Sequence, residues 1–239
     1  MYDSRELTRV RVSLLLVAAI GWACLLLQPG TPMHARTVTS LAASWAIMLI
    51  AMMSPALIWP VHHLRRRSFK HRRTRAVALF AAGYAAIWIA LGGMLVAFEL
   101  AVMRLAPHSY RPAVVALLVA LVWQCSPIKQ RCLNRCHAHP ELAVFGAAAD
   151  FQALRFGMTH ALWCAGSCWA LMLFAMLLPE GHLVAMAAAT VLILGERLER
   201  PRAARWGVHG LGKTIRIVVA QAKIRLPPAV SLFRAQSQT

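Results

Sequence analysis

Five soft metal donors recur at every fourth position of one apolar stretch: His160, Cys164, Cys168, Met172 and Met176. In an α-helix, a step of four residues advances slightly more than one turn, so these side chains share one slowly drifting stripe. Imidazole, thiolate and thioether are the ligands that soft ions such as Cu(I) prefer. The spacing favours a metal site, with apolar packing and thiol redox chemistry as the alternatives.

A second group of thiols precedes this stretch. Cys132 and Cys136 have the spacing of one helical face, and Cys125 lies shortly before them. In a reducing cytosol, grouped thiols are more typical of metal ligands or transient redox centres than of structural disulfides. A single C-x3-C pair is less specific than the paired C-x2-C units of zinc sites. Cys132 and Cys136 are therefore a second candidate metal site.

Met48, Met52 and Met53 form a third candidate, directly before Pro55. Met48 and Met52 share a helical face, and Pro55 removes a backbone donor and can kink the helix. Methionine more commonly fills irregular gaps between apolar helices. We expect these residues to bind metal only if their helix packs against the stripe of soft donors.

Six apolar stretches must position these side chains, at residues 12–27, 41–60, 76–103, 112–125, 157–178 and 182–195. The chain is 59% hydrophobic and only 14% charged, which excludes an ordinary soluble domain. A helix needs ~20 apolar residues to cross the roughly 30 Å hydrocarbon core of a bilayer. The sequence predicts an all-α, polytopic transmembrane bundle of about six spans, of which the fourth and sixth are the shortest.

The basic residues predict the orientation of this bundle. All but three of the 26 Lys and Arg residues fall in alternate segments between the apolar stretches, including both ends of the chain. Positive charge is retained in the cytoplasm, so we expect both termini there, in a multi-pass protein of a bacterial inner membrane. The net charge of +18 is then explained by anionic lipids as partners, and no nucleic acid is expected.

The domain organisation is expected to be simple. Residues 1–200 are predicted to form one transmembrane helical metal-binding domain, and residues 201–239 a basic cytoplasmic tail. Within the tail, Leu211 to Leu226 mix apolar and basic residues as amphipathic helices at membrane surfaces do. Glu141 to Arg155 are expected to form a short helix on the cytoplasmic face.

Four blocks of sequence resemble a known family. They are Trp45 to Pro55, Tyr84 with Trp88, Gln124 to Lys129 with Cys132 and Cys136, and Gly157 with His160 and Cys164 to Met172. Together they resemble the bacterial family of predicted metal-binding integral membrane proteins that is described as copper chaperone-like, over roughly Leu41 to Glu196. The sequence departs from the family pattern at Trp123, where Tyr is common, and at Ser167, where a further Cys is frequent.

The resemblance implies a metal function for the candidate residues, namely His160, Cys164, Cys168, Met172, Cys132, Cys136, Met48, Met52 and Met53. We expect a non-enzymatic inner-membrane protein that binds Cu(I). It would receive the ion from a copper-donating protein or deliver it to a copper-accepting protein. Zinc is the alternative metal. A membrane thiol–disulfide oxidoreductase and a non-catalytic assembly or scaffold subunit are the alternative functions.

Overall fold

Every regular element of the described chain is helical. The structure is a computed structural model that describes residues 2–27, 37–106 and 109–207. The helices are α1 (Tyr2–Leu27), α2 (Val38–Met53), the 3-10 turn η2 (Ser54–Leu57), α3 (Ile58–Arg67), α4 (Arg73–Leu105), α5 (Arg111–Cys125), α6 (Pro127–Cys136), α7 (Gly146–Leu177) and α8 (His182–Arg197). The predicted all-α fold class is confirmed.

The second apolar stretch is broken at Pro55, as the sequence predicts. Proline has no backbone N–H and cannot continue the hydrogen-bonding pattern of α2, so the chain passes through the 3-10 turn η2 before α3 begins. The Ser54 hydroxyl donates to the carbonyl oxygen of Ile50, 2.6 Å away. Met53 is thus the last residue of α2, directly at the break.

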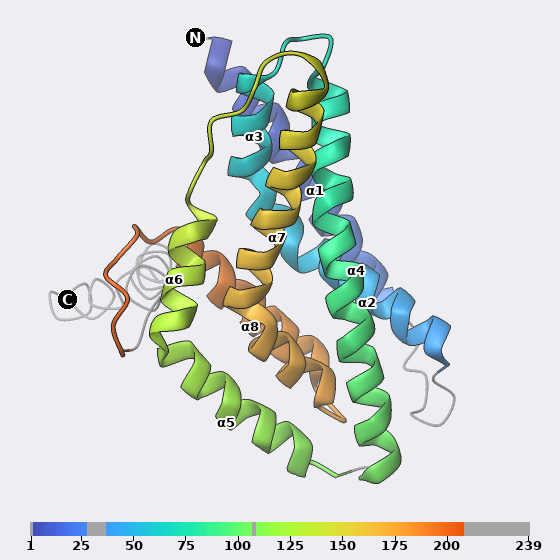
Figure 1. Cartoon of the computed structure of the whole chain (residues 1–239). Coiled ribbons are helices and arrows are strands. Elements are labelled where there is room, and N and C mark those ends of the chain that lie inside the picture. Colours follow the sequence, from blue (N-terminus) through green and yellow to red (C-terminus); the bar gives the residue numbers. More distant parts are fainter. Residues whose placement is uncertain (1, 28–36, 107–108, 208–239) are drawn as a thin grey trace, which may run out of the picture.

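The two longest helices, α4 and α7, lie side by side and run in the same direction (Figure 1). Their backbones meet at Gly157 of α7, where a Cβ atom would lie 2.0 Å from the carbonyl oxygen of Phe80. Small residues allow this close approach between helices in a bilayer. The contact sets the register in which α7 presents its donors beside Tyr84 and Trp88 of α4.

Ion pairs gather four helix ends at one end of the bundle. Glu6 of α1 pairs with Arg65 of α3 and Arg73 of α4, and Asp150 of α7 pairs with Arg72 and Arg75. We call this region the basic end; it is defined by Glu6, Arg65, Arg72, Arg73, Arg75 and Asp150. Helices α4 and α7 both begin there, and α1 is antiparallel to the α2–α3 segment.

The described helices include four or five candidate membrane spans. Four helical segments are long and apolar enough to cross a bilayer, within residues 5–27, 38–67, 73–105 and 146–177. A fifth is possible if α5 and α6 count as one span, although they are bent by 68°. The bend follows from Ser126, whose hydroxyl caps α6, and from Pro127 in its first turn. Helix α8 has only 16 residues, so the predicted six spans are not confirmed.

Two further helices were expected outside the predicted spans. The separate surface helix expected at Glu141 to Arg155 is wrong: residues 141–145 have no regular structure, and α7 starts at Gly146 and continues unbroken to Leu177. The amphipathic helix expected at Leu211 to Leu226 lies outside the described residues. The described start of the tail lies along α6, where Asn134 binds the backbone of Arg202.

Candidate metal centre

Four sulfur atoms from two helices meet in the core of the bundle. On α7, the sulfur atoms of Cys168 and Met172 are 3.8 Å apart, and the Cys164 sulfur is 3.8 Å from that of Met53 on α2. The thiols of Cys164 and Cys168 are in contact with each other. Each of the four side chains is at most 1% exposed. We call Met53, Cys164, Cys168 and Met172 the sulfur cluster.

The cluster joins two groups that the sequence places far apart. The four-residue spacing puts Cys164, Cys168 and Met172 on one face of α7. The α2 helix ends beside that face, so Met53 approaches the Cys164 thiol. Met48 and Met52, which share a helical face in the sequence, are buried in the same apolar core.

A charged side chain that the sequence analysis did not single out lies against the cluster. Arg197, the last residue of α8, donates from Nη2 to the Cys164 sulfur over 3.0 Å. The Tyr84 hydroxyl lies 3.4 Å from the same sulfur. The only sequence signal was the pair Glu196-Arg197 at the end of an apolar stretch, which is also the ordinary place for charges at a membrane boundary. A guanidinium beside a thiol favours the thiolate.

The second pair of thiols lies on the other side of Cys164. Cys136 of α6 is buried, and its thiol contacts the Ser167 hydroxyl. A Cβ atom on Gly166 would lie 2.8 Å from the Cys132 sulfur, so α6 packs directly on α7 at this level. The α6 thiols thus lie beside residues 164–167 of α7.

A buried ion pair holds α6 and α8 together next to these thiols. Lys129 of α6 donates to the carboxylate of Glu196, which also accepts from the amide of Gln124. Both charged side chains are only 1% exposed. Buried charges are costly unless they are paired. The pair fixes the end of α8, and with it Arg197, whose carbonyl oxygen is 3.1 Å from Nε2 of His137.

His160 lies one turn from Cys164 on the side of the basic end. The side chain is 3% exposed and packs among the rings of Phe80, Tyr84 and Phe156. Its Nε2 atom has no hydrogen-bond partner among the described residues. A buried imidazole nitrogen without a partner is available to a ligand.

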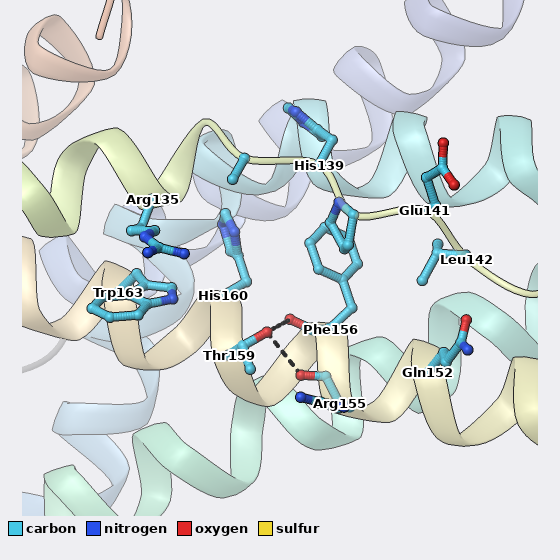
Figure 2. Close-up of a pocket in the computed structure, with 12 residues that line it drawn as sticks. Arg135, His139, Glu141, Leu142, Gln152, Arg155, Phe156, Thr159, His160 and Trp163 are labelled. Carbon is cyan, nitrogen blue, oxygen red and sulfur yellow. Dashed lines mark hydrogen bonds between the residues drawn. The ribbon is translucent and has the colours of Figure 1, made fainter. Parts of the chain in front are cut away.

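Beside His160 is a cavity of about 580 Å³ between α7 and the segment that follows α6 (Figure 2). We call it the His160 pocket; Arg135, His139, Glu141, Arg155, His160 and Trp163 line it together with smaller and apolar side chains. The Arg135 guanidinium lies over the Trp163 ring, 5.7 Å from its centroid. The His139 ring is tilted against the ring of His63, with ring centroids 4.8 Å apart.

The donor set decides which metals fit. Within residues 2–27, 37–106 and 109–207, no three His, Cys, Asp or Glu side chains come together. The described side chains therefore form no cage of carboxylates or imidazoles. The sulfur cluster instead combines two thiols with two thioethers, which is the chemistry that suits a soft ion such as Cu(I).

Comparison with known proteins gives a family but no individual relative. Neither a curated protein nor a solved structure shows significant similarity to the chain. The sequence profile of the PpoB2 family, described as copper chaperone, matches residues 42–220. That range contains every candidate ligand, from Met48 to Met172, as well as Arg197. The chain belongs to this copper chaperone family.

Proposed function

We propose that the protein is a membrane-embedded copper carrier whose sulfur cluster binds Cu(I) and passes it on by ligand exchange. The observation that carries the proposal is the contact between Arg197 and Cys164, next to Cys168, Met53 and Met172. Two thiolates would form the charged part of the site, and the two thioethers would be weaker, neutral donors. Copper is here the cargo that the protein hands over.

Charge balance supports a monovalent metal over zinc. A Cu(I) ion bound by two thiolates carries one negative charge, which the Arg197 guanidinium cancels. A Zn(II) ion bound by the same thiolates is neutral, so Arg197 would leave one uncompensated positive charge. Because uncompensated charge is costly in an apolar interior, the site should prefer Cu(I).

The orientation follows from the basic end. In our proposal the protein lies in a bacterial inner membrane, with the basic end in the cytoplasm. Helix α7 then runs outward, so His160 is on the cytoplasmic side of the sulfur cluster and Met176 on the opposite side. Fusions of a periplasm-requiring enzyme should be active after Thr31 and Glu180 and inactive at Lys70. Activity at Lys70 would reverse the proposed polarity.

Thiol–disulfide exchange is the competing function, because Arg197 would also activate a nucleophilic thiolate. Reactive thiols must meet their substrates, however, and catalytic cysteines are usually partly exposed. Cys164 and Cys168 are 0% and 1% exposed. Burial under Met53 and Tyr84 therefore favours an ion over a protein disulfide as the group that reaches them.

X-ray absorption spectroscopy of the copper-loaded protein tests the proposal. The spectrum should be that of Cu(I) with sulfur neighbours only, because the sulfur cluster contains no nitrogen or oxygen donor. A metal-free protein that cycles between dithiol and disulfide would support the oxidoreductase instead. A protein with neither bound copper nor redox-active thiols would support the scaffold function.

A further inference from the structure

We propose that the His160 pocket admits copper as an anionic Cu(I) complex of a low-molecular-weight thiol, and not as a bare cation. The inference rests on the proposed function and deepens it, since it names the chemical form of the substrate and the site that receives it. It depends on three features of the pocket: its charge, its size and its position next to the sulfur cluster.

The charge of the pocket disfavours a free metal cation. Arg135 and Arg155 line it against a single acid, Glu141 (Figure 2). Outside the pocket, Arg197 lies 3.0 Å from the sulfur of Cys164, one helical turn along α7 from His160. The Trp163 ring holds the Arg135 guanidinium at 5.7 Å from its centroid. A cavity with low-dielectric walls focuses such a field and raises the local concentration of ions of opposite charge. The pocket should therefore attract an anion, and Cu(I) bound by two thiolates is one.

The size of the pocket fits a small carrier. Its volume of about 580 Å³ lies within the range of roughly 300–1,000 Å³ that is typical of small-molecule sites. The walls also have the composition of such a site, with Phe156, Trp163 and Leu142 as apolar surfaces and a few polar groups among them. The carrier that fits the pocket is therefore a low-molecular-weight thiol, and a copper-carrying protein is the alternative that the experiment tests.

The position of the pocket gives the metal a route to the sulfur cluster. His160 both lines the pocket and precedes Cys164 by one helical turn, and its buried Nε2 has no partner among the described side chains. Figure 2 shows its ring on the pocket side of α7. Nε2 can therefore hold the ion briefly as the carrier ligands depart, before the thiols of α7 take it.

The transfer is a ligand exchange without redox change. Copper enters as Cu(I) with two carrier thiolates, and leaves the carrier to bind Cys164 and Cys168. Each of these two thiols gives its proton to one departing carrier ligand, so both carrier ligands leave as thiols. Two Cu–S bonds break and two form, so charge and protons balance, and copper stays Cu(I).

The experiment measures the rate at which the full-length protein in nanodiscs captures copper from two sources. One source is the Cu(I) complex of glutathione, which is anionic, and the other is the cationic Cu(I) complex of acetonitrile. The variant combines Arg135→Gln with Arg155→Gln. We expect it to capture copper from glutathione about tenfold more slowly at low salt, the lower bound for electrostatic steering. The final copper content should be unchanged, and capture from the cationic acetonitrile complex should be as fast as in wild type or faster.

Two control variants separate charge from damage to the fold. Arg131→Gln changes an exposed arginine of α6 that does not line the pocket, and should behave as wild type. The single variant Arg135→Lys keeps both positive charges of the pocket and should retain most of the wild-type rate.

Three results would overturn the proposal. The first is equal capture from glutathione by the double variant and wild type, and the second is equal slowing with both copper sources. The third is slowing only when a soluble copper-binding protein is the donor, which would assign the pocket to a protein carrier. Failure of the proposed function looks different, because wild type would then retain no copper from any source.

Discussion

The guanidinium of Arg197, at the end of α8, lies 3.0 Å from the sulfur of Cys164 in the middle of α7. The two residues come from different helices, and the buried pair Lys129–Glu196 fixes the helix end that carries Arg197. The contact places a positive charge directly beside the first thiol of the sulfur cluster. In the proposed function this charge balances a Cu(I) dithiolate, so we expect the charge of the metal ion to decide which ion binds.

Arg197→Met should therefore weaken Cu(I) binding and shift the preference toward zinc. A hydrogen bond to a charged group is worth about 1.5–3 kcal/mol, which corresponds to a loss of affinity of roughly tenfold or more. Competition titrations with a Cu(I) chelator and with zinc measure both effects. Arg197→Lys should retain much of the preference, and Arg200→Met, at an exposed arginine nearby, should change nothing. An unaltered Cu(I) to Zn(II) ratio in Arg197→Met would exclude the charge argument.

Ser167→Cys should strengthen copper binding. Ser167 is buried, contacts the Cys136 thiol and donates to the carbonyl oxygen of Cys164 at 2.7 Å. A thiol at this position would stand between the α6 thiols and the sulfur cluster and add a further soft donor. Cu(I) affinity, measured by chelator competition, should rise or a second copper ion should bind. No change in affinity or stoichiometry would mean that the α6 thiols do not take part.

Gly157→Ala should destabilise the protein through the contact between α4 and α7. The added Cβ would lie 2.0 Å from the Phe80 carbonyl oxygen, and a backbone atom cannot move away without shifting the helix. Overpacking of this kind costs about 1–3 kcal/mol. The melting temperature in detergent should fall, whereas Gly93→Ala, where nothing lies within 4 Å, should leave it unchanged or slightly higher. Equal melting temperatures would contradict the parallel packing of α4 on α7.

Acid should destabilise the loop that carries His139. Partial burial, followed by the nearby His63, lowers the pKa of His139 below its ordinary value of 6.5. The unfolded chain therefore takes up a proton at a pH where the folded protein still excludes it, so stability is lost as the pH falls through 6.5. His139→Gln should reduce the drop in melting temperature between pH 7.5 and pH 5.5 (roughly one pH unit either side of the ordinary value). An unchanged drop would show that other groups dominate.

The helical class and the shared helix face of Cys164, Cys168 and Met172 could be predicted from the sequence, because both depend on local patterns. Apolar length predicted the long helices, and the four-residue period placed Cys164, Cys168 and Met172 on one face. Pro55 predicted the break after Met53. These are properties of single segments, which short-range periodicity encodes.

The remaining features depend on packing between segments, which periodicity does not contain. Arg197 reaches Cys164 only because α8 is short and is held by Lys129. Cys136 meets Ser167 only because α6 turns away from α5 by 68° and packs on α7. The same bend leaves the number of spans between four and five by length and composition, instead of the six predicted.

Copper quantification on the Cys164→Ser/Cys168→Ser double variant tests the central claim most directly. The two thiols are the only anionic donors in the sulfur cluster, so their loss should abolish tight Cu(I) binding while the helical protein stays in the membrane. The single variant Met172→Leu, which removes a neutral thioether, should weaken binding less. If the correctly inserted double variant retains the copper content and affinity of wild type, the sulfur cluster is packing, and the proposed metal centre is wrong.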